Sequence, residues 1–263
     1  MIPYFKITTL PLGPLQIQVW GLMVSLGVIG GLLVGLREAV SRGISKERFV
    51  DAAAVIVLAA LIGGRLGYIF LYDLSVLDEG WFGLVTIWKG GMSSFGGFIG
   101  ALIGGAVFCR LKRIPLKDIA VPAMFGTTLG YGIGRIGCFL IHDHPGVRST
   151  FWLAVRYPDG PRLDHGLLLS LLGFGIFLSL VLLRRFSRSD PGLRYIWWTL
   201  LLYGSFRFWF DFYRAWDLPG SDLRLMILTP AQYGSSVFVL TAVWFLIVWP
   251  AWRRWRHPEP SDR

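Results

Sequence analysis

The chain has 263 residues, of which 54% are hydrophobic and 16% are charged, and its mean hydropathy is +0.57. Soluble domains carry about 25% charged residues, so the composition excludes an ordinary soluble protein and predicts an integral membrane protein. A net charge of +10 is also typical of nucleic-acid-binding proteins, but here the basic residues lie between apolar stretches, as in the loops of membrane proteins. We therefore expect a lipid bilayer, and no nucleic acid, as a partner.

Seven apolar stretches each approach the roughly 20 residues that a helix needs to cross a bilayer. The predicted spans are residues 16–36, 50–72, 91–109, 118–141, 166–183, 195–213 and 232–250. The start of the chain lacks the basic region of a cleavable signal peptide, so we expect the first stretch to remain as a span. The sequence thus predicts an all-α integral membrane protein, with residues 1–263 forming a single seven-helix domain.

The distribution of basic residues predicts the orientation, because Lys and Arg gather on the cytoplasmic side. With the N-terminus outside, the cytoplasmic segments hold sixteen Lys and Arg residues, the outer segments hold seven, and three arginines remain within the spans. We therefore predict an N-out, C-in topology. The longest outer segment, residues 142–165, is expected to form a small periplasmic cap.

Three arginines, Arg65, Arg135 and Arg207, lie within predicted spans two, four and six. A cation at this depth is costly, so such residues usually line a wet cavity or bind an anionic partner. Each lies seven or eight residues before the outer end of its span, which is roughly 10–12 Å of helix. We expect the three guanidinium groups to form one site for an anionic ligand. The alternative is that each arginine snorkels or pairs with a local carboxylate, as Arg207 can with Asp211.

Glycines recur every four residues in predicted spans one, three and four, at a spacing that lets helices approach closely. These glycines are Gly27, Gly31 and Gly35, then Gly96, Gly100 and Gly104, then Gly126, Gly130 and Gly134. The pairs at residues 90–91 and 96–97 are denser than packing requires. They predict a broken or re-entrant start to the third span, where backbone N–H groups could face a polar head group.

The cap segment holds three of the four histidines, and His142, Asp143 and His144 are consecutive. A His/Asp cluster can bind a metal, but the His-Asp-His spacing matches no standard zinc arrangement. We therefore expect no metal, and assign these residues to proton transfer or hydrogen bonding. Cys109 and Cys138 fall in opposite halves of the membrane in the predicted topology, so they are expected to be packing residues and not a disulfide.

Four short motifs, in order over most of the chain, resemble those of the prolipoprotein diacylglyceryl transferase family. They are GGRLGY at residues 63–68, GGMSSFGG at 90–97, GRIGCFLIHDHPG at 134–146 and YGSFRFWFD at 203–211. The predicted seven spans and outside N-terminus are similar to the topology of that family. On these motifs the chain is identified as a divergent member of the family.

The resemblance implies a transfer reaction. Family members move the diacylglyceryl group of phosphatidylglycerol to the thiol of the lipobox cysteine in a prolipoprotein signal peptide, and they release glycerol phosphate. This is the first step of bacterial lipoprotein maturation, and it takes place at the outer leaflet of the inner membrane. The resemblance implies no cofactor, and a monomer whose active site lies within one chain.

The resemblance also assigns roles to residues. Arg135 would hold the phosphatidylglycerol head group, and Arg207, oriented by Asp211, would stabilise the phosphate as it leaves. Further substrate contacts are implied for Arg65, Gly96, Gly97 and Gly146. Fixed guanidinium groups in a water-poor site stabilise the charge that develops on a departing phosphate. They also favour the thiolate of an incoming cysteine, whose free pKa is about 8.5.

Several residues of the family pattern are replaced in this chain. The histidine before the second glycine pair, proposed in the family to act in proton removal, is Phe95 here. Two asparagines of the third motif are Cys138 and Ile141, and its glutamate is Asp143. The sequence therefore retains the residues implied in phosphate binding and lacks the family's proposed base.

His142 and His144, together with Asp143, are the candidate substitutes for the missing base, and His165 is a third histidine in the same segment. Two other readings stay open at this point: arginine electrostatics suffice for catalysis, or the acceptor has changed. A phospholipid-binding relative without transferase activity is an alternative function. An anion transporter is less favoured, because the inner parts of the arginine-bearing spans carry few ionisable residues to continue a path.

Overall fold

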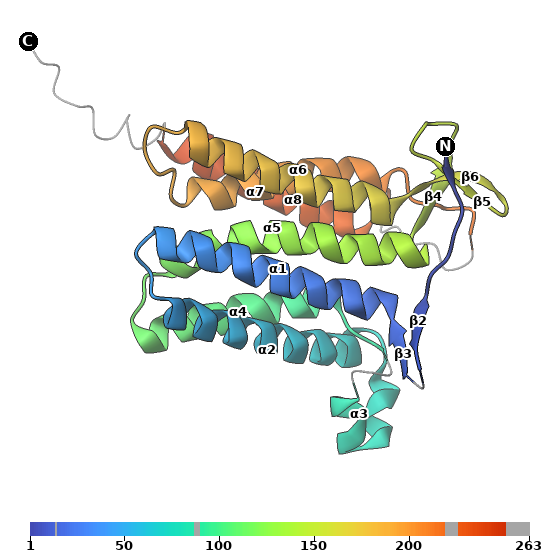
Figure 1. The fold of residues 1–263 in the computed structure, drawn as a ribbon, viewed down its shortest axis with the longest axis horizontal. Helices are drawn as coiled ribbons and strands as arrows, with labels where there is room; N and C mark the ends of the chain where they lie inside the picture. The colour runs from blue at the N-terminus through green and yellow to red at the C-terminus, as the bar shows by residue number, and fades with distance from the viewer. Residues whose placement is uncertain (14, 87–89, 219–225, 251–263) are drawn as a thin grey trace, which may run out of the picture. The chain divides into compact units, whose positions relative to one another are not determined.

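The computed structural model describes residues 1–13, 15–86, 90–218 and 226–250 and is dominated by helices (Figure 1). The helices are α1 (Val19–Ser41), α2 (Lys46–Leu71), the 3-10 helix η1 (Leu74–Glu79), α3 (Trp81–Val85), α4 (Ser94–Lys112), α5 (Leu116–Ile141), α6 (His165–Phe186), α7 (Arg194–Asp211), α8 (Pro230–Val243) and the π-helix η3 (Trp244–Val248). Lys89, Arg224 and the basic residues after residue 250, which entered the predicted orientation, lie outside the described residues.

Six of the described helices are long and apolar enough to cross a membrane, namely α1, α2, α4, α5, α6 and α8 with its continuation η3. They match six of the predicted spans to within a few residues, which confirms a multi-pass helical membrane protein. The remaining predicted span, 195–213, coincides with α7. That helix carries Arg194, Arg207 and Asp211 among its 18 residues and is not one of the six, so its crossing of the membrane stays a prediction.

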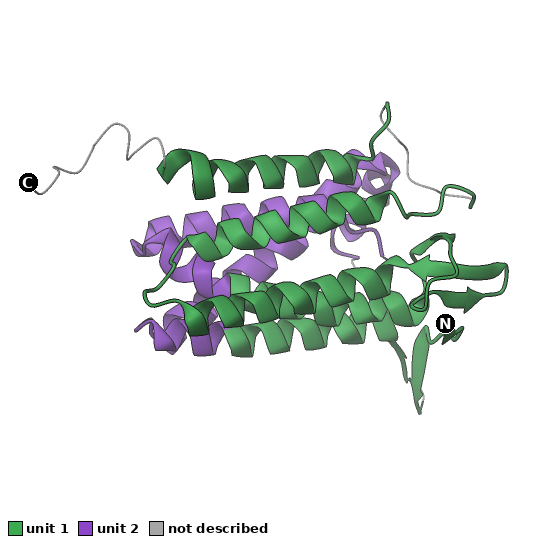
Figure 2. Cartoon of the chain, turned by 90° about the horizontal axis from the view of Figure 1, so that it is seen from above, with its two compact units in different colours: residues 1–34, 124–263 green, residues 35–123 purple. Residues whose placement is uncertain are grey.

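The described residues form two compact units, one of residues 1–34 and 124–263 and the other of residues 35–123 (Figure 2). The first unit contains most of α1 and α5, all of α6, α7 and α8, and the strands. The second contains α2, η1, α3 and α4, with the end of α1 and the start of α5. The single domain predicted over residues 1–263 stays a prediction.

The predicted glycine stripes form helix contacts within each unit. In the second unit α2 packs on α4, and a Cβ added to Gly96 would lie 2.3 Å from the carbonyl oxygen of Gly63. In the first unit α1 meets α5, and a Cβ added to Gly126 would lie 2.3 Å from the carbonyl oxygen of Gly31. No side chain fits at such distances, so close backbone packing, as predicted, requires these glycines.

The 142–165 segment is a small β-sheet, and not the helical or irregular cap that an all-α fold would imply. Its strands are β4 (Pro145–Arg148), β5 (Val155–Tyr157) and β6 (Gly160–Asp164), and β1 (Ile2–Pro3) joins them in the order β1-β5-β6-β4. β1 runs parallel to β5, and β6 is antiparallel to both β4 and β5. A separate hairpin pairs β2 (Thr9–Leu12) with β3 (Leu15–Gln18). Strands this short leave no readable period in the sequence, so the prediction missed them.

A buried arginine fixes the sheet to the end of α7. Arg162, only 1% exposed, forms ion pairs with Asp159 and Asp217, each at 2.6 Å, and donates to the carbonyl oxygen of Gly146 at 3.1 Å. Hydrogen bonds to the two carboxylates raise the pKa of Arg162, and the arginine in turn lowers the pKa of both aspartates. The sheet therefore has a rigid attachment to the chain beyond α7.

Candidate functional site

Arg135 lies near the end of α5, and within the described ranges no acidic side chain pairs with it. Its Nη1 donates to the Sγ of Cys138 at 3.8 Å, and its guanidinium lies over the ring of Tyr131, 5.1 Å from the centroid. Both neighbours come from the same helix, at the i+3 and i−4 positions. Among the residues that the structure describes, no ion pair includes Arg135. In the described part of the chain its neighbours are the Cys138 thiol and the two phenols Tyr131 and Tyr203, and no carboxylate pairs with it. This half-buried cation therefore has hydrogen-bonding capacity left for an anion.

Arg207 on α7 is paired with Asp211, as the four-residue spacing predicts. The Asp211 carboxylate is fully buried, and its second oxygen accepts a hydrogen bond from the hydroxyl of Thr229. Thr229 caps α8 together with Gln232: the amide N–H of Thr229 donates to the Gln232 side chain at 3.0 Å, and the amide N–H of Gln232 donates to the Thr229 hydroxyl at 3.2 Å. Arg207 therefore follows the alternative of pairing with a carboxylate on its own helix. Its orientation is set by Asp211, which Thr229 holds in place at the start of α8.

Two tyrosines connect the two arginines. The rings of Tyr131 on α5 and Tyr203 on α7 meet edge to face, with centroids 5.6 Å apart. Tyr131 interacts electrostatically with both Arg135 and Arg207, and Tyr203 interacts with Arg135. Within the first unit, the structure thus brings two guanidinium groups from separate helices to one pair of phenols. The role of these tyrosines was not predicted from the sequence, although each lies four residues before its arginine in a shared Tyr-x-x-x-Arg pattern.

Arg65 belongs to the second unit and is bound by backbone carbonyls. It donates to Gly83, Gly90 and Gly91, with its Nη1 bonds at 2.8 and 3.0 Å, and to the hydroxyl of Thr86 at 3.4 Å. These bonds use all five N–H groups of the guanidinium. Arg65 therefore ties residues 83–86 and 90–91 to α2. Its predicted meeting with Arg135 and Arg207 at one site stays a prediction.

The predicted non-helical entry to the third span is confirmed, because residues 90–93 are not helical and α4 begins at Ser94. Gly90 and Gly91 have φ angles of +91° and +75°, a region that favours glycine. The N–H groups of Gly96 and Gly97, which we expected to face a head group, instead donate to the side chain and the carbonyl of Ser93, the N-cap of α4. The substrate contacts predicted for Gly96 and Gly97 stay predictions.

Two further positions of the family pattern, Phe95 and Gly146, have different surroundings. Phe95, at the family's histidine position, is 63% exposed. A Cβ added to Gly146 would lie 2.6 Å from the carbonyl oxygen of Tyr213 and 2.8 Å from that of Leu163. Gly146 is therefore required for close backbone packing of β4, and its substrate contact also stays a prediction.

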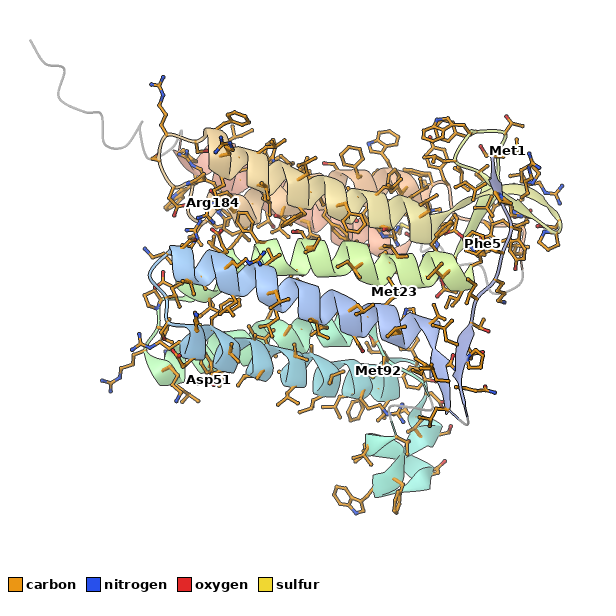
Figure 3. The ribbon with its side chains drawn as sticks, viewed as in Figure 1. Met1, Phe5, Met23, Asp51, Met92 and Arg184 are labelled. Atoms are coloured by element: carbon orange, nitrogen blue, oxygen red, sulfur yellow. The ribbon has the colours of Figure 1, made fainter. Side chains whose placement is uncertain are left out.

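His142 is completely buried in an aromatic cage beyond the end of α5. Its Nδ1 lies 2.7 Å from the carboxylate of Asp164, the N-cap of α6, and its ring stacks on Tyr4 with centroids 4.9 Å apart. Phe5, labelled in Figure 3, and Phe139 pack against the same imidazole. Within the described part of the chain, Nε2 has no hydrogen-bond partner. This environment favours a role in fixing the turn after α5 over contact with a substrate.

Tyr157 completes the cage around His142. Its hydroxyl donates to the Asp164 carboxylate at 2.6 Å. Burial and the neighbouring carboxylate raise the pKa of Tyr157, so the phenol remains a hydrogen-bond donor at neutral pH. The turn after α5 is thereby held by a network of three polar side chains.

His144 is the histidine beside Arg135. Its imidazole is 35% exposed, and its Nε2 lies 3.7 Å from the carboxylate of Asp143. Burial lowers the pKa of His144; Asp143 opposes this shift, whereas the charges of Arg135 and Arg214 add to it. The lowered pKa favours the neutral imidazole of His144. Arg214, predicted from the sequence only as a basic residue of an outer segment, lies close enough to act on this site.

His165 has a structural role at the start of α6. Its Nε2 donates to the carbonyl oxygen of Phe210 at 2.7 Å, which ties α6 to α7. Of the three histidines considered as substitute bases, only His144 thus combines exposure with proximity to Arg135. The predicted base roles of His142 and Asp143 stay predictions.

The helices and this cluster together define a multi-pass membrane protein in which arginines and tyrosines gather within one helical unit. Residues 7–248 match the model of the family described as prolipoprotein diacylglyceryl transferase, and the chain belongs to this family. The resemblance found in the four motifs is thereby confirmed.

The chain is also similar to several proteins named phosphatidylglycerol–prolipoprotein diacylglyceryl transferase. It is 33% identical to that of Chromohalobacter salexigens over 243 residues, 90% of each chain. It is 32% identical to that of Geobacillus kaustophilus over an alignment of 271 positions, which covers 95% of each chain. The match to that of Geobacter sulfurreducens is also 32%, over 82% of this chain and 83% of the relative.

Proposed function

We propose that the chain transfers the diacylglyceryl group of phosphatidylglycerol to a cysteine thiol of a prolipoprotein and releases glycerol phosphate. The names of its relatives state these two substrates. The observation that carries the proposal is the environment of Arg135. This half-buried cation has no carboxylate partner among the described residues, and its neighbour Tyr131 also interacts electrostatically with Arg207. Such a cluster suits a phospholipid phosphate, because guanidinium groups match phosphate oxygens in charge and geometry.

In the proposed step the acceptor sulfur forms a bond to the glyceryl carbon as the bond from that carbon to the phosphate oxygen breaks. The electron pair of the broken bond stays on the phosphate, so negative charge grows there in the transition state. Arg135 and Arg207 stabilise this charge, and the hydroxyls of Tyr131 and Tyr203 are further donors in the same place. Asp211 acts as a positioning residue, because one of its oxygens holds Arg207 and the other is held by Thr229.

The acceptor thiol must lose its proton before or during this step, since the thiolate is the nucleophile. Phe95 cannot take the proton, and His142 is enclosed by aromatic rings. His144, with Asp143 beside it, is the group of this chain best placed to serve deprotonation. The acceptor is proposed to be the lipobox cysteine of a signal peptide.

The finer topology belongs to the same proposal. We assign α7 as a seventh span, because pairing Arg207 with Asp211 reduces the cost of carrying both charges into the membrane. The excess of Lys and Arg on the segments assigned to the cytoplasm supports an N-out, C-in orientation in the bacterial inner membrane, with the sheet over residues 142–165 as a periplasmic cap. The chain is proposed to act as a monomer, since Arg135, Arg207 and His144 all lie in one unit of one chain.

Complementation of a bacterium depleted of its own transferase tests this function. The intact chain is expected to restore growth, and Arg135→Ala to abolish the rescue. Arg148→Ala, which removes a 65% exposed arginine of the cap, is the matched control and should still rescue. An intact chain that reaches the membrane but gives no rescue would contradict the proposal and favour a phospholipid-binding relative. Anion flux through liposomes containing the chain would instead indicate a transporter.

A further inference from the structure

Three side chains of types that can bind a metal gather next to Arg135. The thiol of Cys138, the carboxylate of Asp143 and the imidazole of His144 each offer one donor atom, and these atoms all lie within 4.8 Å of one another. Cys138 comes from the last two turns of α5, whereas Asp143 and His144 follow the end of that helix. The thiol is buried, and the other two side chains are each 35% exposed, so the cluster is open to solvent on one side.

The fold holds these residues in place through the turn between them. His142 has a φ of +50°, a left-handed conformation that is rare for residues other than glycine. Its imidazole is locked by Asp164 and the aromatic cage, which offsets the strain. The carbonyl of His144 accepts a hydrogen bond from the amide of His165 at 3.1 Å. Both ends of the Asp143–His144 pair are thus fixed by the surrounding structure.

The donor set matches a particular class of ion. Three protein ligands drawn from Cys, His and Asp, with the fourth position open, are typical of catalytic zinc sites. Zinc bonds of about 2.0–2.3 Å place donor atoms roughly 3–4 Å apart, so small side-chain rotations suffice to close the cluster. A thiolate and a carboxylate would neutralise the two charges of the ion, which allows the cationic Arg135 to remain beside it.

We propose that Cys138, Asp143 and His144 bind a divalent zinc-class metal ion whose open position takes the acceptor thiol. This role rests on the proposed transferase function, and it makes His144 a metal ligand in place of a free base. The acceptor thiol binds the ion as thiolate and its proton passes to water. The sulfur then bonds to the glyceryl carbon, and the electron pair of the breaking carbon–oxygen bond leaves on the phosphate beside Arg135.

Cobalt absorption tests the site without reference to activity. The full chain, purified in detergent with a histidine-free tag, is stripped with a chelator and titrated with Co²⁺. We expect a thiolate-to-cobalt charge-transfer band and the visible bands of a four-coordinate ion. Cys138→Ser should remove the thiolate band, whereas Cys109→Ser, which changes the only other cysteine, should keep it. His144→Ala should weaken binding at least about tenfold, a loss seen even when outer-shell partners of metal ligands are removed.

Two results would overturn the site: no thiolate band at excess Co²⁺, or an unchanged band in Cys138→Ser. A transfer assay of the stripped chain, with and without added Zn²⁺, then tests its role. Restoration by Zn²⁺ supports the role, and equal activity in both samples overturns it. Absence of transfer in both samples, when the cobalt spectrum is normal, would contradict the transferase function and leave the metal site standing.

Discussion

A buried arginine is stable in a membrane protein only where something takes up its charge and its hydrogen bonds. The three arginines predicted to lie in the membrane meet the requirement in different ways. Arg65 gives all five N–H groups to protein oxygens, and Arg207 is paired with Asp211. Among the described residues, Arg135 meets the thiol of Cys138 and the phenols of Tyr131 and Tyr203, and it has no carboxylate partner there. Of the three arginines, Arg135 therefore has the most hydrogen-bonding capacity left for an anionic ligand.

Replacing Arg135 by lysine tests this difference. Lys keeps the charge but loses the planar fork that bonds phosphate through two parallel N–H groups. We expect diacylglyceryl transfer from phosphatidylglycerol to fall by about 10²-fold or more, in the range found when one stabilising donor is lost from an oxyanion site. Arg148→Lys is the control. Full activity of Arg135→Lys would indicate that charge alone matters at this position.

Removing the Asp211 carboxylate should destabilise the protein as well as inactivate it. Asp211→Ala leaves Arg207 without its anionic partner and the Thr229 hydroxyl without an acceptor. Breaking a buried ion pair from one side costs about 3–5 kcal/mol, so the thermal unfolding midpoint in detergent should fall clearly. Asp78→Ala, at an exposed site, should leave the midpoint unchanged. A stable Asp211→Ala protein would contradict the view that this carboxylate fixes α7 to α8.

At the scale of elements, helix contacts in this chain depend on glycine. In the first unit a Cβ on Gly126 would lie 2.3 Å from the backbone of Gly31, whereas a Cβ on Gly175 of α6 would meet nothing within 4 Å. Gly126→Ala should therefore force α1 away from α5 and cost about 1–3 kcal/mol by overpacking. Gly175→Ala should be neutral or slightly stabilising, because alanine is the better helix former. Equal unfolding midpoints for the two variants would refute close backbone packing at Gly126.

The attachment of the sheet should depend on pH through Arg162. The pKa values of Asp159 and Asp217 are lowered in the folded protein by their bonds to this arginine. Because folding lowers their pKa values, the two carboxylates stabilise the folded protein fully at a pH above the ordinary carboxyl pKa of about 3.9. This stabilisation is lost as the pH falls through the lower pKa of the folded state. Limited proteolysis within residues 142–165 should therefore accelerate below about pH 4. In Arg162→Ala cleavage should be fast at every pH; an unchanged acid dependence in this variant would contradict the assignment.

At the scale of the whole molecule, the proposed orientation places the sheet and the loop after α6 on opposite sides of the membrane. In a background with Cys109 and Cys138 replaced by serine, Ser149→Cys lies in the sheet segment and Ser187→Cys follows α6. A membrane-impermeant maleimide applied to intact spheroplasts should label the first variant and not the second. Permeabilised cells should allow both to react. Labelling of Ser187→Cys alone in intact spheroplasts would reverse the topology.

The sequence by itself determined the features that depend on neighbours along the chain. Apolar runs fix the helical spans, because crossing a bilayer requires about 20 consecutive apolar residues. The Arg207–Asp211 pair and the glycine stripes follow from the helical repeat, which brings residues four apart onto one face. The ordered motifs were enough to indicate the family.

Only the tertiary structure decided which distant groups meet. It enclosed His142 and left His144 beside Arg135. It brought the donor atoms of Cys138, Asp143 and His144 within 4.8 Å of one another, although their spacing in the sequence matches no standard metal site. It also built a sheet from strands of two to five residues. These outcomes depend on one left-handed turn at His142 and on contacts between segments far apart in the chain, which no local pattern encodes.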